Sequence, residues 1–369
     1  MPNPAPRHAG AVDMRSDTVT RPTPAMKQAM MAAELGDDVF GDDPTVKALE
    51  RRIAALTAKE AALYVPSGTM GNELAVAVHT RPGDEVLLEV RSHIFSAEQG
   101  SLAANSGCLA HVVHAERGRI GPEAIEQALR TEDDHHACLA LLCLENTHNM
   151  HGGTIVPLEL VRATAAAAHA HDMAVHLDGA RLWNASVATG LSIAELAAPA
   201  DTVMMCFSKG LGAPVGSILA GPERLMRAAR RVRKRWGGGM RQAGVLAGAC
   251  LYALDHHVAR LADDHARARR LAAGLAAPGV RVAAPETNIV FVAFEDPALD
   301  PARVLDGLEL RGVRWSQYDT RLRAVLHLDV DDAGVERAIA AFHDSLDQAR
   351  AARRPTAGAA AAMDRPIGA

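Results

Sequence analysis

The chain has 369 residues, 49% of them apolar and 22% charged, and a formal net charge of −5 at pH 7. This length suits two domains, and the mixed, weakly negative charge argues against nucleic acid as a partner. The five cysteines are scattered without metal-ligand spacing, as expected of reduced residues in a cytoplasmic protein. We expect no signal peptide and no contact with a membrane, because the longest apolar run, Ala137–Leu144, is too short to span a bilayer.

The predicted elements follow an order typical of an α/β fold. Residues 1–12 are expected to be a disordered leader and residues 13–43 an N-terminal arm. Over 44–258, short apolar strands alternate with helical patterns, which predicts a large domain with a mostly parallel sheet covered by helices on both faces. A smaller α+β domain is predicted over 259–350 and a disordered tail over 351–369. The predicted strands are Ala62–Val65, Glu85–Glu89, Ala110–Val113, Leu139–Leu144, Ala174–Leu177, Thr202–Phe207, Gly216–Ala220, Thr287–Phe294 and Leu322–Leu328, and the clearest helices are Pro44–Leu56, Gly71–Val78 and Leu158–His171.

Two strand ends carry the first indication of chemistry. Lys209 follows the strand Thr202–Phe207 and precedes a glycine turn, so its amine would face the interior, where desolvation favours the neutral, nucleophilic form. Asp178 ends the strand before it, and ligands bind at the carboxyl edge of such sheets. This is the pair that pyridoxal 5′-phosphate (PLP) requires: the lysine forms a Schiff base with its aldehyde, and the aspartate keeps its pyridine nitrogen protonated.

A phosphate anchor is predicted after the strand Ala62–Val65. Ser67, Gly68 and Thr69 stand between this strand and the next helical pattern. Glycine lets backbone amides approach an anion, a helix start adds positive potential, and the two hydroxyls add donors. Such a connection is common in α/β proteins, and it gains weight here from the lysine and the aspartate of the same sheet.

Seven motifs, in order over roughly residues 14 to 335, resemble those of the low-specificity L-threonine aldolases. The resemblance therefore covers nearly the whole predicted fold. Several of the motifs are specific to this family and are not shared by fold-type I PLP enzymes at large. The motifs are MRSDTVT at 14–20, GDDVFGDDPT at 36–45, LENTH at 144–148, HLDGAR at 176–181, SKGLG at 208–212, GGGMRQ at 237–242 and HLD at 327–329.

The resemblance implies a fold-type I PLP enzyme that cleaves L-threonine or L-allo-threonine to glycine and acetaldehyde. It also implies a homotetramer, a dimer of dimers, with active sites shared across a dimer interface. Lys209 then matches the Schiff-base lysine and Asp178 the partner of the pyridine nitrogen. Gly68 and Thr69 match phosphate binders, and His93 matches the imidazole that stacks on the cofactor ring.

The resemblance also assigns polar residues around the cofactor. Arg181 and Arg323 match arginines at the cofactor and the substrate carboxylate, and Ser16 matches a serine near that carboxylate. Arg241, together with Lys234, matches basic residues near the site that reach a neighbouring subunit. These residues predict a site that binds a small amino-acid substrate.

The sequence leaves open which group removes the proton of the substrate β-hydroxyl. His93 is the first candidate, because imidazole titrates near neutral pH. His135 or His136, just before the strand Leu139–Leu144, could remove the proton instead or bind the hydroxyl, and an ordered water is a third option. Phe40 stands where the family usually has tyrosine, which bears on substrate preference.

Other functions stay open at this point. The same cofactor would serve an amino-acid racemase, a β-eliminating lyase or a phenylserine aldolase, because the reaction depends on which substrate bond stands perpendicular to the ring. A non-enzymatic α/β binding protein, with Lys209 incidental, is the remaining alternative. His148 and His151 suggest a metal, but no third ligand stands at suitable spacing, so we predict a loop role and no metal site.

Overall fold

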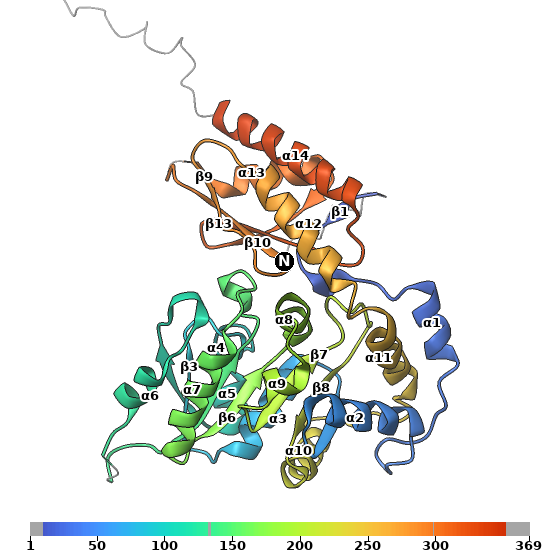
Figure 1. Ribbon diagram of the computed structural model, residues 1–369, viewed down its shortest axis with the longest axis vertical. Helices are drawn as coiled ribbons and strands as arrows, with labels where there is room; N and C mark the ends of the chain where they lie inside the picture. The colour runs from blue at the N-terminus through green and yellow to red at the C-terminus, as the bar shows by residue number, and fades with distance from the viewer. Residues whose placement is uncertain (1–9, 132–133, 298, 352–369) are drawn as a thin grey trace, which may run out of the picture.

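The computed structural model describes residues 10–131, 134–297 and 299–351. A seven-stranded sheet forms the centre of its larger part (Figure 1). In chain order the strands are β2 (Ala61–Val65), β3 (Glu85–Glu89), β4 (Leu109–Val113), β5 (Leu139–Glu145), β6 (Ala174–Asp178), β7 (Thr202–Cys206) and β8 (Ser217–Gly221). Their order across the sheet is β2-β8-β7-β6-β5-β3-β4, and of these seven only β8 runs against the others. The carboxyl ends of β5, β6 and β7 therefore lie along one edge.

Both faces of this sheet are buried, as the continuous apolar strands predict. Neighbouring residues of β7 belong to different core clusters: Val203 and Met205 pack in the largest one, whereas Met204 and Cys206 pack on the opposite face. The helices that surround the sheet are α2 (Pro44–Thr57), α3 (Gly68–His79), α4 (His93–Ser96), α5 (Ser101–Ser106), α6 (Pro122–Ala128), α7 (Leu158–Ala170), α8 (Leu182–Thr189), α9 (Ile193–Ala197), α10 (Glu223–Arg235) and α11 (Gly244–His256), with α1 (Pro24–Met31) packed on α11.

Helix α3 begins three residues earlier than the predicted Gly71. The hydroxyl of Ser67 caps it by accepting a hydrogen bond from the amide of Met70. Two glycines let its first turn lie directly on β7: a Cβ on Gly68 would stand 2.8 Å from Sγ of Cys206, and one on Gly71 2.6 Å from Cγ of Met204. Close helix–sheet packing therefore requires these glycines and sets the helix start at the edge of the sheet.

The C-terminal part has a core of its own, formed on a four-stranded antiparallel sheet. The strand order is β12-β13-β10-β9, and the chain order is α12 (Leu261–Gly274), β9 (Val280–Val282), β10 (Ile289–Phe294), α13 (Pro301–Leu310), β11 (Val313–Arg314), β12 (Ser316–Tyr318), β13 (Arg321–Val325) and α14 (Asp332–Ala351). The predicted α/β class with a smaller α+β part is confirmed, while the exact limits of the domains stay a prediction.

The N-terminal segment joins this smaller part (Figure 1). Strand β1 (Val12–Asp13) pairs in parallel with β11, and the side chain of Met14 is buried in the C-terminal core. Val12 therefore belongs to a strand, although we expected it to lie in a disordered leader. Ala351, expected in the disordered tail, is the last residue of α14. The rest of the leader up to residue 9 and the rest of the tail from residue 352 lie outside the described residues. None of the helices in the described ranges has the length and apolar character needed to cross a bilayer.

Candidate active site

Two cavities adjoin at the carboxyl edge of the large sheet. The smaller one, of about 160 Å³, is lined by the start of α3 and by the ends of β6 and β7. The larger one, of about 320 Å³, reaches the N-terminal segment and β13. Thr18, His93 and Lys209 line both cavities, so the two spaces form one site with two adjoining parts.

Lys209 lies in the turn between β7 and β8, where the predicted strand end places it. Its side chain is half-buried and lines both cavities. Its carbonyl accepts hydrogen bonds from the hydroxyl of Thr20 at 2.9 Å and from the amide of Gly212 at 2.8 Å. Gly212 has a φ of +76°, which favours glycine, so the SKGLG motif makes a tight turn that holds the lysine in place.

Asp178 is the buried carboxylate at the end of β6. Its Oδ2 accepts a hydrogen bond from Nδ2 of Asn72 at 2.9 Å, and its Oδ1 accepts one from the amide of Ala180 at 3.0 Å. The orientation of Asn72 is fixed by His176, whose Nε2 lies 3.1 Å from Oδ1 of the amide. Burial lowers the pKa of His176 to about 4, so this histidine is neutral at pH 7.

His93 begins helix α4 and lines both cavities of the site. Its Nδ1 lies 2.8 Å from Oε1 of Glu98, which also accepts a hydrogen bond from Asn72 at 2.9 Å. Its backbone amide donates to Oε2 of Glu145 at 2.7 Å. Burial opposes protonation of the imidazole, but the hydrogen bond to Glu98 and the charge of Asp178 outweigh burial and raise the pKa of His93.

Arg181 forms a buried, two-pronged ion pair with Asp17. Its Nε and Nη2 donate to the two carboxylate oxygens, each at 2.7 Å. Burial alone would raise the pKa of Asp17, but the adjacent guanidinium outweighs it and holds that pKa well below its usual range. The guanidinium of Arg181 therefore pairs with the N-terminal segment and not with the neighbouring Asp178.

Arg323 projects from β13 into the larger cavity. Its Nη1 donates to Oδ1 of Asn149 at 3.0 Å and its Nη2 to the carbonyl of Arg15 at 3.0 Å, while its guanidinium carbon lies 4.4 Å from the ring centre of Tyr318. Among the described residues its Nε has no hydrogen-bond partner. The cavity is also lined by Ser16, whose hydroxyl accepts a hydrogen bond from the amide of Thr18 at 3.2 Å.

Two predicted site residues line neither cavity. Arg241 is exposed and pairs with Asp37, with 3.0 Å between Nη1 and Oδ2. His135 is exposed in the segment before β5. Within one chain, the structure therefore brings together Lys209, Asp178, His93, the turn at 67–69 and the residues expected at the substrate carboxylate. Arg241 and His135 lie outside this group.

The structure adds functional residues that the sequence did not single out: Asn72, Glu98, Asp17 and Asn149. Asn72 links both buried carboxylates, and Asn149 accepts from Arg323 and, at 3.3 Å, from Arg181. One signal was available, since Asn72 is a polar residue on the buried face of a largely apolar helical pattern. Its partners, however, come from distant segments, which no spacing in the sequence reveals.

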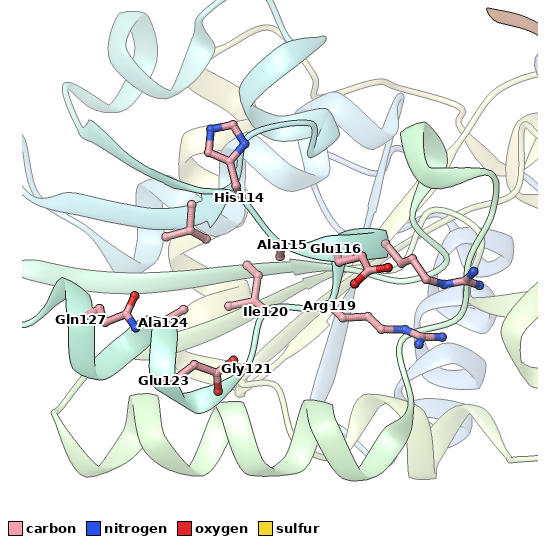
Figure 2. A pocket seen from close by; sticks show the side chains of 11 residues that line it. His114, Ala115, Glu116, Arg119, Ile120, Gly121, Glu123, Ala124 and Gln127 are labelled. Carbon is pink, nitrogen blue, oxygen red and sulfur yellow. The ribbon is translucent and has the colours of Figure 1, made fainter. Parts of the chain in front are cut away.

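A further cavity of about 570 Å³ lies apart from this site. Figure 2 shows its lining, which comes from residues 113–127, from the end of β4 into α6. It contains His114, Glu116, Arg119 and Glu123 but shares no residue with the two adjoining cavities. Although this cavity has the larger volume, it contains none of the candidate site residues, so we do not assign catalysis to it.

A strand-end lysine and a buried strand-end aspartate at one edge of a mostly parallel sheet define a fold-type I enzyme. The chain belongs to the beta-eliminating lyase family, whose sequence pattern matches residues 13–297. It is similar to low-specificity L-threonine aldolase 1 of Arabidopsis thaliana, with 42% identity over 345 residues that cover 91% of this chain and 96% of that protein. The family predicted from the seven motifs is confirmed.

Solved structures show the same fold. Threonine aldolase of Leishmania major superposes with a TM-score of 0.77 at 22% identity, covering 91% of this chain and 99% of that one. A variant of serine palmitoyltransferase from S. paucimobilis, solved with a bound PLP adduct, superposes with a TM-score of 0.71 at 19% identity, covering 92% and 88% of the two chains. The predicted fold class, fold-type I, is confirmed, and the structural neighbours include PLP enzymes.

Proposed function

We propose that this protein is a PLP-dependent aldolase that cleaves L-threonine or L-allo-threonine to glycine and acetaldehyde by breaking the Cα–Cβ bond. The observation that carries the proposal is the arrangement of Lys209, Asp178 and His93 around one cavity, next to a second cavity with Arg323. Membership of a family whose curated members are named low-specificity L-threonine aldolases supports it. The cavities support a small amino acid as the substrate.

The residues around the smaller cavity fit PLP. Helix α3 directs its first amides, at Gly68 and Thr69, to a position suited to a phosphate group, and Ser67 and Thr69 add hydroxyl donors. Asp178 would hold the pyridine nitrogen, and Lys209 would hold the aldehyde carbon. When bound, the cofactor supplies an electron sink for the bonding electrons released at Cα.

Arginines of the larger cavity would hold the substrate carboxylate. Arg323 has a free Nε in the described structure and lies beside Asn149, which both it and Arg181 contact. A planar guanidinium can grip a carboxylate with two parallel hydrogen bonds, which fixes rotation about Cα. That orientation selects the bond that breaks, so these residues decide between aldol cleavage and the reactions of related enzymes.

His93 is the proposed base for the β-hydroxyl proton. Its Nδ1 is engaged by Glu98, which leaves Nε2 as the nitrogen available to accept a proton. His135 is exposed and lines neither cavity within one chain, which favours His93 as the base. Glu98 is a positioning residue, since it acts on the substrate only through the imidazole.

We also propose a cytoplasmic homotetramer, a dimer of dimers, in which a neighbouring subunit covers the exposed N-terminal surface. Phe40 is 77% exposed and Met31 85% exposed, values that are high for large apolar side chains. Nearby, Lys234 and Arg233 line a cavity of about 420 Å³ with other basic residues of α10. Arg241 would bring its charge toward the cofactor phosphate of the neighbouring subunit.

Product analysis distinguishes this function from a racemase, a β-eliminating lyase, a phenylserine aldolase and a binding protein. Purified holoenzyme is incubated with L-threonine, L-allo-threonine or L-phenylserine, and glycine, aldehyde, keto acid and D-amino acid are measured. We expect equimolar glycine and acetaldehyde from a threonine isomer. Keto acid with ammonia, a D-amino acid, cleavage of phenylserine alone or no turnover at all would each overturn the proposal.

A further inference from the structure

A second cluster of ligand-type side chains lies beside the active site. Glu89 ends β3, and His148 and His151 follow β5. Oε2 of Glu89 lies 3.2 Å from Nε2 of His148, and Oε1 lies 3.4 Å from Nε2 of His151. One ligand atom from each residue falls within 4.8 Å of the others. The sequence showed no third ligand close to the two histidines along the chain; in the fold, Glu89 of the neighbouring strand β3 takes this place.

Three histidine nitrogens of this cluster are buried without hydrogen bonds to the described residues, whereas Oε2 of Glu89 accepts one from the amide of Arg91 at 2.7 Å. Glu89 is 3% exposed and His148 is 1% exposed. Although Nε2 of His148 is close to the carboxylate, neither of its ring nitrogens has hydrogen-bond geometry with any described residue, and the same holds for Nε2 of His151. Buried polar groups are normally hydrogen-bonded, whereas these nitrogens have only ion-pair contacts with Glu89 and Glu145 among the described residues, so a bound ion would complete their coordination.

The spacing suits a metal ion as that partner. In a tetrahedral site with bonds of about 2.0–2.1 Å, neighbouring ligand atoms stand about 3.3–3.4 Å apart. The separations of 3.2 and 3.4 Å, which join the two histidine nitrogens to different oxygens of Glu89, lie near this value. The imidazole rings are also spread and not stacked, with 4.6 Å between centroids and 67° between planes. The ligand atoms of all three residues lie within 4.8 Å of one another, close enough to bind one ion.

We propose that Glu89, His148 and His151 bind one divalent transition-metal ion of the zinc class. The two imidazoles favour an ion of this class over calcium or magnesium, and zinc also accepts a carboxylate oxygen as a ligand. The fourth position is left for water. The ring of His148 is held in place by close packing, since a Cβ on Gly118 would lie 2.2 Å from its Cδ2.

The ion would stabilise the loop that contacts the substrate side of the active site. Asn149 stands between the two histidine ligands in the chain, and its side chain accepts hydrogen bonds from Arg323 and Arg181. A metal joining β3 to this loop would fix Asn149 and thereby both guanidinium groups. The binding site itself does not depend on the proposed reaction, so the two can fail separately.

Calorimetric titration of the untagged holoenzyme with zinc chloride, after removal of bound metal by a chelator, tests the site. We expect one tight equivalent per subunit and a higher melting temperature with zinc. Loss of even an outer partner of a metal ligand costs about 10–100-fold in affinity, so His151→Ala and Glu89→Gln should each weaken binding by at least about tenfold. Control variant His171→Ala removes a surface histidine paired with Glu126 and should bind zinc as the wild type does.

Two results would overturn the site. One is the absence of a tight equivalent in the wild type. The other is binding by His151→Ala and Glu89→Gln as tight as in the wild type, which would assign the zinc to other residues. Melting temperatures without zinc establish that each variant is folded, and His151 is partly exposed, so its replacement is tolerated more easily than that of His148.

Discussion

The imidazole of His93 and the carboxylate of Glu98 are 2.8 Å apart, and Glu98 is buried. This contact fixes Nδ1 as the nitrogen that faces the protein, and it leaves Nε2 for the substrate. Asn72 bonds to the same carboxylate and to Asp178, so the base and the expected partner of the pyridine nitrogen share one hydrogen-bond network.

Replacement of Glu98 by glutamine should lower the pKa of His93, because the charge that favours the imidazolium is lost. A base acts in its neutral form, so kcat/KM should rise with pH through the pKa of His93. In Glu98→Gln this rise, the acidic limb of the pH–rate profile, should move to lower pH. We also expect kcat to fall by about tenfold or more, as general-base catalysis typically contributes at least that much. A pH–rate profile with an unmoved acidic limb would contradict the role of Glu98.

Asp17→Asn should strongly destabilise the fold, because it leaves the Arg181 guanidinium buried without a counter-charge. Removing one partner of a buried ion pair costs about 3–5 kcal/mol. Asp13→Asn is a matched control, since its partner Arg15 is well exposed and surface pairs contribute about 1 kcal/mol at most. Urea unfolding of both variants measures the difference. Equal losses of stability in the two would refute the importance of the buried pair.

Much of this site follows from local sequence, and the rest depends on contacts between distant segments. The positions of Lys209 and Asp178 at the edge of the sheet could be predicted, because each follows an apolar strand and precedes a glycine turn. The start of α3 was missed, because Gly68 and Thr69 were assigned to the turn before the helix, whereas close packing on β7 lets the helix begin at Gly68. Strand β1 has only two residues and therefore no periodicity to detect. The partner of Arg181 lies 164 residues away in the chain.

Stability should fall in mild acid, because the buried His176 and the half-buried His79 are both held in neutral form. Burial lowers the pKa of each from 6.5 to about 4. Between these values the unfolded chain binds more protons than the folded one. Their stabilising effect is therefore complete above pH 6.5 and is lost as pH falls toward 4, at up to about 1.4 kcal/mol per pH unit for each histidine. Urea unfolding at pH 7 and pH 5 checks this, and equal stability at both would contradict it.

Arg323→Lys should raise KM for the amino acid by about tenfold or more, because lysine cannot make two parallel hydrogen bonds to a carboxylate. Lysine also loses the planar contact with Tyr318. Arg321→Lys is the control on the same strand, since that guanidinium packs over Phe291 and lines neither of the two cavities. Steady-state kinetics on L-threonine should show a large change in KM for the first variant only. Matching KM values in both would show that Arg323 does not hold the substrate.

The central claim is that Lys209 holds PLP and drives the cleavage. Borohydride reduction of the yellow holoenzyme, followed by digestion and mass spectrometry, tests it directly, with Lys209→Ala and the exposed-lysine control Lys47→Ala treated in parallel. We predict a reduced PLP adduct on the peptide that contains Lys209, present in Lys47→Ala, and neither adduct nor glycine formation in Lys209→Ala. An adduct on another lysine, or a Lys209→Ala variant that stays yellow and active, would contradict the account.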